Sequence, residues 1–365
     1  MKRIIYLFVL IAFIAACNNE PHYTVKGEID GSDSVTFLIQ KREEGRTVTI
    51  DSALSKKGSF SMTGSVEYPE LVQLVAKDRR YRISFYLENT KISITGKLDS
   101  LYNADITGSK THDEYKAYLE SNKELSQKYS AIYQDYQVAR QTNDTAKISS
   151  IEKEAEEIQN EMTRLQKDFV RNNPSSYVAP SILRNLSYDM EAVEIEAAIN
   201  AMDTNVAKIP IVRDLMARVI AMKAVSIGQK APDFTLNNVD GKPVSLSSKV
   251  GAKLLLIDFW AAWCGPCRQE NPNVVKVYNQ FHKKGFDIFG VSLDQTKEEW
   301  VKAISDDKLA WTHVSDLQYW SSAAAKLYAV NAIPANFLLD ETGTIIARNL
   351  RGQALYDKVN EVLGK

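Results

Sequence analysis

The sequence predicts an α/β domain at the C-terminus, preceded by an antiparallel β domain and a helical hairpin region. Three successive patterns along the 365 residues support this order. Apolar and polar residues alternate from about residue 22 to 107, and apolar residues then recur at steps of three and four from about 111 to 172. Beyond residue 226, apolar strands alternate with helical segments, which is typical of an α/β sheet.

Residues 1–16 have the pattern of an export signal. Lys2 and Arg3 give a positive start, and the apolar run from Ile4 to Ala16 is shorter than the roughly 20 residues of a membrane-spanning helix. The run ends in Ile-Ala-Ala-Cys, which resembles a bacterial lipobox and implies a lipid on Cys17. The alternative is an ordinary cleaved signal that leaves Cys17 as an odd thiol.

Residues 17–108 form the predicted antiparallel β domain, for which we expect a compact sandwich or barrel without a catalytic constellation. Turn chemistry separates its apolar alternations. The alternating positions are Val25/Gly27/Ile29, Val35/Phe37/Ile39, Phe60/Met62 and Ile83/Phe85/Leu87, and the turns are Asp30-Gly31, Lys57-Gly58 and Glu88-Asn89.

Residues 109–225 form the predicted helical domain, which begins with a long antiparallel hairpin. Two heptad seams indicate its arms, and Asn143, Asp144 or Thr145 could cap the second arm. The tyrosine-rich first seam could bind a partner, but packing against the second arm is favoured because heptad stripes mainly bury one another. The seams are Tyr115, Tyr118, Asn122, Leu125, Tyr129, Ile132, Tyr136 and Ala139, then Ile148, Ile151, Ala155, Ile158, Met162, Leu165 and Phe169. Shorter helices are expected at about 176–187, 191–202 and 209–224.

Residues 226–365 form the predicted α/β domain. The apolar run 254–257 indicates a buried parallel strand that ends at Asp258, and a helix follows from about residue 265. Cys264 and Cys267 therefore lie where a strand passes into a helix. The other expected elements are a strand pair near Phe234 and Val244, a strand from Phe286 to Ser292, helices at about 296–305 and 320–328, a hairpin of residues 335–339 and 345–348, and a terminal helix from near Leu355.

This placement suits thiol chemistry. A helix N-terminus favours an anion, so the Cys264 thiol should ionise below the free-thiol value of about 8.5 and act as the nucleophile. Cys267 would then resolve the resulting mixed disulfide. Pro266 fits a first helical turn, and Gly265 leaves the approach to Cys264 open.

The residues around the pair resemble those of a known family. The segment from Ile257 to Arg268 is similar to thioredoxin, including Trp-Cys-Gly-Pro-Cys-Arg. The segments 228–234 and 240–246 resemble the opening of the TlpA/ResA-like and AhpC/TSA-like branch, as does Arg-Gln-Glu-Asn-Pro at 268–272. The β region resembles, more weakly, a domain of unknown function that precedes thioredoxin domains in bacterial envelope lipoproteins.

The resemblance implies roles for further residues. Asp258 would accept a proton from the inner cysteine, and Glu270 matches the branch's active-site glutamate. Many TlpA/ResA-like proteins lack an acid at the position of Asp258 and rely on the glutamate, whereas this chain has both Asp258 and Glu270. Pro334 would be cis, beside the disulfide, and the Ile333 backbone would pair with an extended substrate. The predicted substrate-binding residues are Ile333, Pro334, Trp263, Gly265 and Pro266.

We therefore expect a thiol-disulfide oxidoreductase that reduces client disulfides through Cys264 and Cys267, with cytochrome c maturation as one setting. Structural zinc is the main alternative for the cysteine pair, but four ligands are needed and the four histidines are scattered. A peroxidase of the AhpC/TSA-like branch would have a Pro and a Thr shortly before its reactive cysteine, whereas this chain has Phe259 to Trp263 there, so peroxidase chemistry is not supported. A binding module with an accessory redox domain is the alternative from another class.

The cysteines and the net charge indicate the cellular location and the partners of the protein. The protein is expected in the cell envelope, facing the periplasm, with the outer membrane favoured over the inner. Only three cysteines occur, so once Cys17 is lipidated the redox pair itself is the working group and no cofactor or metal is expected. The periplasm is oxidising, so a membrane thiol donor must recharge the pair. The net charge of −1, without a basic block, indicates no nucleic-acid partner.

Overall fold

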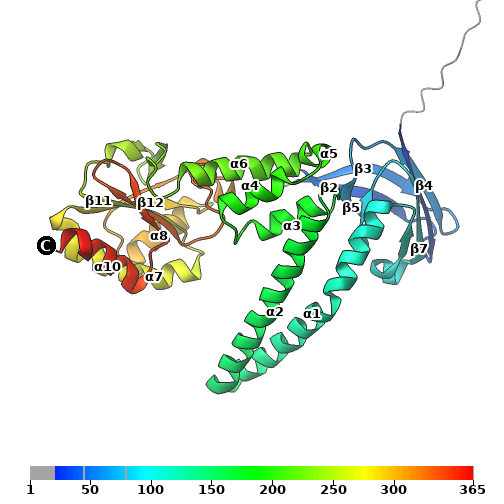
Figure 1. The fold of residues 1–365 in the computed structure, drawn as a ribbon, viewed down its shortest axis with the longest axis horizontal. Helices are drawn as coiled ribbons and strands as arrows, with labels where there is room; N and C mark the ends of the chain where they lie inside the picture. Colours follow the sequence, from blue (N-terminus) through cyan, green and yellow to red (C-terminus); the bar gives the residue numbers. More distant parts are fainter. Residues whose placement is uncertain (1–20, 44–45, 79, 365) are drawn as a thin grey trace, which may run out of the picture. The chain divides into compact units, whose positions relative to one another are not determined.

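The computed structural model describes residues 21–43, 46–78 and 80–364 (Figure 1). The predicted signal peptide and Cys17 lie outside these residues. The chain divides into two compact units: the first runs to Leu165 and includes Ser176–Ala179, and the second contains Gln166–Ser175 and everything from Pro180 onward. The division falls inside the second long helix, and the domain boundaries at 108 and 225 stay predictions.

The β region of the first unit is a sandwich of two four-stranded sheets, with strand orders β4-β1-β7-β8 and β3-β2-β5-β6. The alternating residues of the sequence, such as Val25, Phe37 and Phe85, fill the core between the sheets. One pairing differs from the antiparallel expectation, because β1 and β7 run parallel. No tight turn joins these two strands, so the chain can return in either direction. The strands are β1 (Tyr23–Asp30), β2 (Thr36–Glu43), β3 (Arg46–Leu54), β4 (Ser59–Gly64), β5 (Glu70–Ala76), β6 (Arg82–Leu87), β7 (Lys91–Lys97) and β8 (Asp105–Thr107).

The two long helices are α1 (Lys110–Gln141) and α2 (Thr145–Asn172). Their predicted seams pack against each other, with Ile132 and Ala139 of α1 in one buried cluster with Ile151 and Ile158 of α2. Asp144 caps α2, because its carboxylate accepts a hydrogen bond of 3.0 Å from the backbone N–H of Lys147. In the described part of the chain, no helix is both long enough and apolar enough to cross a membrane.

Shorter helices follow the hairpin along the chain, and the last of them, α6, is capped at its C-terminus by the buried residue Val225. Val225 packs into the core of the α/β domain and so anchors the segment that follows it. That segment is fixed to a strand, because the Gly228 N–H donates to the Ile345 carbonyl at 2.8 Å. The helices are α3 (Ala179–Leu186), α4 (Ala192–Asn200), α5 (Thr204–Ala207), which was not predicted, and α6 (Pro210–Ala224).

The C-terminal domain contains a seven-stranded mixed sheet with the order β10-β9-β13-β12-β11-β14-β15, the central part of a thioredoxin-like fold. Strand β11 lies inside the sheet, parallel to β12 and antiparallel to β14. The strands are β9 (Thr235–Asn238), β10 (Pro243–Ser245), β11 (Leu254–Trp260), β12 (Phe286–Ser292), β13 (Thr312–Ser315), β14 (Ala335–Asp340) and β15 (Ile345–Arg348), and the helices are α7 (Gly265–Phe281), α8 (Lys297–Asp306), α9 (Ala323–Leu327) and α10 (Gly352–Leu363).

Alternate residues of β11 face two different cores. Leu254, Leu256 and Trp260 share a cluster with residues of α7 and α10, and these two helices lie side by side in Figure 1. Leu255, Ile257 and Phe259 point the other way, into a cluster that includes residues of α9. Because side chains alternate along a strand, Asp258 lies on the α7 face, the face that carries the cysteine-bearing helix.

Replacing Leu256 with alanine should destabilise the α/β domain strongly. Leu256 is fully buried, so Leu256→Ala is expected to lower the free energy of unfolding by about 2–5 kcal/mol through lost burial and the cavity left behind. All five tryptophans lie beyond residue 259, so urea unfolding followed by tryptophan fluorescence reports on this domain. Leu327→Ala is the matched control, because Leu327 is 37% exposed and should cost less than about 1 kcal/mol. Equal losses in the two variants would contradict the assigned core.

Candidate active site

Strand β11 and helix α7 bring Cys264 and Cys267 together. The two sulfurs form a disulfide of 2.01 Å, and both residues are buried. Cys264 is the N-cap residue of α7, and its Sγ accepts a hydrogen bond of 3.1 Å from the backbone N–H of Cys267. A free N–H at the first turn of a helix would also stabilise a thiolate at Cys264 in the reduced protein.

Several residues that the sequence predicted near the cysteine pair lie there in the structure. The Ile333–Pro334 peptide bond is cis, as predicted, and the Ile333 carbonyl oxygen lies 3.6 Å from the Cys264 Sγ. A Cβ placed on Gly265 would meet no atom within 4 Å, so the space beside Cys264 is open there. Pro266 occupies the first turn of α7. These positions fit the predicted substrate-binding role, which stays a prediction.

The turn before Cys264 is held by Asp294, which the sequence did not single out. The Asp294 carboxylate accepts from the backbone N–H of Ala262 at 3.0 and 3.2 Å and from the Ser292 hydroxyl at 2.7 Å. Asp294 is fully buried, and this burial raises the pKa of its carboxyl. Asp294 therefore positions the backbone that leads into the reactive cysteine.

Arg268 holds the same turn from the other side and was also missed as a positioning group. Its guanidinium binds both carboxylate oxygens of Asp307, at 2.5 and 2.8 Å, and donates to the Ala262 carbonyl at 3.3 Å. Asn271, which is buried, donates to the same carboxylate at 2.6 Å. Two hydrogen bonds in the fixed geometry of a guanidinium give this contact directional precision. It ties the first turn of α7 to the end of α8.

Asp258 is buried at 5% exposure, so it is not a solvent-facing strand-end residue. Its pKa is raised to about 7, chiefly by burial and also by the negative charge of Glu270, while the positive charge of Arg351 opposes both. A carboxyl group with this pKa can exchange a proton near neutral pH. The predicted transfer from Cys267 to Asp258 thus has a suitable acceptor on the correct face of the sheet.

Glu270 joins α7 to the start of α10. Its Oε1 accepts from the backbone N–H of Gly352 at 2.8 Å and from the Asn273 side chain at 2.9 Å. The neighbouring Arg351 donates to the Pro334 carbonyl, so one short segment contacts both the glutamate and the loop of the cis peptide. Glu270 is half-buried and hydrogen-bonded, which differs from a freely solvated helix glutamate. Its role as a catalytic group stays a prediction.

Two charge-removing variants should move the titration of Asp258 in opposite directions. Glu270→Gln removes a negative charge, so the pKa of Asp258 should fall, whereas Arg351→Gln removes a positive charge, so that pKa should rise. A carbon-13 titration of the aspartate carboxyl groups in the full chain measures both shifts. Shifts of the same sign, or none, would contradict the assigned electrostatics.

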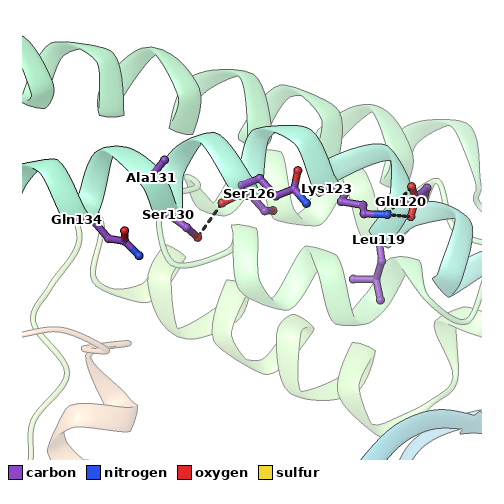
Figure 2. A pocket seen from close by; sticks show the side chains of 8 residues that line it. Leu119, Glu120, Lys123, Ser126, Ser130, Ala131 and Gln134 are labelled. Carbon is purple, nitrogen blue, oxygen red and sulfur yellow. Dashed lines mark hydrogen bonds and ion pairs between the residues drawn. The ribbon is translucent and has the colours of Figure 1, made fainter. Parts of the chain in front are cut away.

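Other features of the described residues lie outside this site. A surface depression runs along α1 and is lined by residues of that helix alone (Figure 2). Its charged pair, Lys123 and Glu120, is joined by an ion pair of 2.9 Å, and the Ser130 hydroxyl donates to the Ser126 carbonyl. Over the described ranges of the chain, no group of three or more His, Cys, Asp and Glu side chains could hold a metal ion. The cysteine pair is thus the feature of the described structure with the clearest chemistry.

Comparison with known proteins gives the same chemistry. Residues 227–348 match the AhpC/TSA family, and residues 23–115 match a domain of unknown function, DUF4369. The thiol-disulfide oxidoreductase ResA of Geobacillus thermodenitrificans is 31% identical over 122 residues, which cover 33% of this chain and 68% of that protein. The thioredoxin-like protein YneN of Bacillus subtilis is 35% identical over 121 residues, which cover 32% of this chain and 68% of that protein.

Solved structures with related sequences include the thioredoxin domain of a thiol-disulfide oxidoreductase from Bacteroides vulgatus, at 39% identity, 38% coverage of this chain, 98% coverage of that chain and a TM-score of 0.36. A thiol:disulfide interchange protein from a Bacteroides species is 38% identical, with 39% of this chain and 93% of that chain covered and a TM-score of 0.36. The assignment of this chain to a family rests on the relatives found by sequence. This chain belongs to the family of ResA-like thiol-disulfide oxidoreductases, through a thioredoxin-like domain of the AhpC/TSA family.

Proposed function

We propose that this protein is a lipid-anchored reductase of the periplasm that reduces disulfides in client proteins through Cys264 and Cys267. The observation that carries the proposal is the disulfide at the first turn of α7, where the Cys267 N–H contacts the Cys264 Sγ. The export signal and the lipobox-like end at Cys17 support the envelope location and the lipid anchor.

Reduction of a client takes two exchange steps. In the reduced protein, the Cys264 thiolate attacks one sulfur of the client disulfide, a mixed disulfide forms, and the other client sulfur leaves as a thiolate that takes a proton from water. The Cys267 thiol then gives its proton to Asp258, attacks Cys264 and releases the second client sulfur. Two electrons have passed to the client, and the Cys264–Cys267 disulfide has formed.

The burial of Asp258 supports its part in the second step. With a pKa of about 7, more than half of the carboxyl is ionised above neutral pH, where it can accept the Cys267 proton and later return it to solvent. Asp294 and Arg268 keep the turn at Ala262 fixed while Cys264 changes its bonding partner. Both groups therefore serve as positioning residues in this proposal.

Regeneration requires a dithiol donor, because each turnover leaves the pair oxidised. In an oxidising compartment this donor would be a membrane protein that carries electrons across the inner membrane. The Gly-Pro sequence between the cysteines favours a reducing pair, since thioredoxin has a potential near −270 mV. Apocytochrome c, which must be reduced before haem is attached, is one client class that fits a ResA-like protein.

Equilibration with glutathione redox buffers tests the direction. The full chain is brought to equilibrium at fixed ratios of reduced to oxidised glutathione, and the fraction of Cys264–Cys267 disulfide is measured by thiol alkylation and mass spectrometry. A potential below about −220 mV supports a reductant, whereas a value near −120 mV, as in a strong oxidant, would reverse the proposed direction.

A mass measurement tests the anchor. A diacylglycerol adduct on Cys17 in protein recovered from the envelope, and its loss in Cys17→Ala together with release from the membrane fraction, would support lipidation. A mature chain that begins before or after Cys17 without a lipid would contradict it.

A further inference from the structure

Three aromatic side chains form a cluster beside the reactive cysteine. Trp263 precedes Cys264 directly, and its ring centroid lies 5.0 Å from that of Tyr319 and 5.9 Å from that of Trp320. Tyr319 and Trp320 are also 5.9 Å apart, so each ring contacts the other two. We call Trp263, Tyr319 and Trp320 the aromatic surface.

The aromatic surface is partly open to solvent and fixed in position, with Trp263 exposed and Tyr319 and Trp320 partly buried. Trp263 is 44% exposed, but its indole Nε1 donates to the Leu293 carbonyl at 3.3 Å, which holds the ring. Trp320 packs partly against the core cluster that contains Cys264. An exposed ring that is locked in place loses little conformational freedom when a partner binds.

The backbone that carries Tyr319 is strained. Leu317 and Tyr319 have φ values of 56° and 54°, in the left-handed region that disfavours bulky residues. Asp316 holds this conformation, because its carboxylate accepts from the backbone N–H groups of Gln318 at 3.2 Å and Ala323 at 3.0 Å. The Leu317 N–H also donates to the Ser315 hydroxyl at 3.0 Å. Strain of this kind persists where the surrounding structure enforces it, and it concentrates at functional sites.

The position of this surface relative to Cys264 defines what it can contact. A client sulfur must approach the Cys264 Sγ, which has the Ile333 carbonyl 3.6 Å away and Trp263 as its neighbour in the chain. Residues beside the client cysteine therefore come close to Trp263 and to the rings packed on it. Aromatic pairs bind more strongly than their buried area alone predicts.

We propose that Trp263, Tyr319 and Trp320 bind a large aromatic side chain that lies next to the client's disulfide-bonded cysteine, and that they thereby select among clients. This inference deepens the proposed function, because it concerns the client of the same cysteine pair. Tryptophan and tyrosine side chains near the centre of an interface commonly supply a large share of its binding energy. Tyr319 and Trp320 are thus specificity residues that the cysteine motif alone does not reveal.

Competing disulfide peptides test the proposal with the reduced full chain. The peptides are identical except for Tyr, Ala or Lys beside the reacting cysteine, and their reduction is followed by stopped-flow mass spectrometry. The Tyr peptide should react with a kcat/KM about five- to tenfold above that of the Ala peptide, the range expected for one additional aromatic contact. In Tyr319→Gly this preference should fall to about twofold or less, because one ring is missing.

The choice of variants separates lost recognition from lost folding. Glycine adopts a φ of 54° without strain, so Tyr319→Gly removes the ring while it preserves the backbone. Tyr319→Phe retains the ring and should retain the preference. Tyr188→Ala is the control, because Tyr188 is an exposed aromatic residue outside the site, and it should leave the preference at the wild-type value.

The outcomes distinguish this inference from the proposed function. Equal rates for the Tyr and Ala peptides, a faster reaction of the Lys peptide, or an unchanged preference in Tyr319→Gly would each overturn the aromatic selection alone. If the wild-type protein reduces none of the three peptides, the proposed reductase function is overturned, and this inference with it.

Discussion

Replacing Cys264 with serine is expected to abolish disulfide reduction. Serine keeps the shape of the side chain but is a much weaker nucleophile, so the rate of client reduction should fall by at least about a thousandfold. The measurement is insulin reduction by the full chain with dithiothreitol as the electron source.

Cys17→Ser is the matched control, because the chain has three cysteines and only two lie at α7. In detergent solution this control should turn over insulin at the rate of the unmodified protein. Full activity in Cys264→Ser would remove Cys264 as the nucleophile, and equal losses in the two variants would point to a general effect of cysteine replacement.

Replacing Asp258 with asparagine should slow the chemistry and stabilise the fold. Without the carboxylate, the Cys267 proton has no nearby acceptor, so release of the client from the mixed disulfide should slow by about a hundredfold at pH 7. Single-turnover kinetics with a disulfide peptide measure this step. An unchanged rate of release would show that Cys267 loses its proton to another group.

The effect of Asp258 on stability has a definite sign with pH. Its pKa is about 7 in the folded protein, above the value of about 3.9 in an unfolded chain. The buried carboxyl therefore favours the folded state most when it is protonated, and stability is lost as pH rises from about 4 through 7. Above pH 7 the buried charge carries its full cost.

Asp258→Asn should consequently raise the free energy of unfolding above pH 7, by up to about 4 kcal/mol, with little gain below pH 4. Urea unfolding at several pH values, followed by tryptophan fluorescence, measures this dependence. Asp240→Asn is the control, because Asp240 lies in an exposed turn, and the same pH dependence in both variants would contradict the assignment.

The sequence was most informative where function depends on local pattern. The cysteine spacing and the apolar strand before it predicted the disulfide site, and the resemblance to thioredoxin predicted the cis peptide bond at Pro334. The heptad steps of α1 and α2 likewise predicted which residues would pack, because a helix seam depends only on spacing along each helix.

Long-range polar contacts could not be predicted in the same way. Asp294 accepts a hydrogen bond from the backbone N–H of Ala262, which lies 32 residues away in the sequence. Asp307 accepts from Arg268, which lies 39 residues away. Charged residues of these types are usually solvated, so the sequence gives no reason to expect them to be bonded inside the domain. No periodic spacing connects Asp294 with Ala262 or Asp307 with Arg268. The strand β13 was also not predicted, because its four residues, Thr312–Ser315, are too few to show an alternation of apolar and polar side chains.

The strained turn at Leu317 and Tyr319 was missed for a related reason. Residues that adopt positive φ are usually glycine or asparagine, and this segment has neither at the two positions. Its conformation depends on the Asp316 carboxylate and on packing against Trp263. Local turn rules therefore fail where tertiary contacts enforce an unfavourable backbone.

Capture of the covalent intermediate tests the proposed thiol exchange most directly. In Cys267→Ser the first attack can proceed but the resolving thiol is absent, so reaction with a disulfide peptide should accumulate a one-to-one adduct. Mass spectrometry of proteolytic fragments should locate the peptide on Cys264, and dithiothreitol should release it. No adduct, or an adduct confined to another residue, would contradict the assignment of Cys264 as the nucleophile that attacks the client.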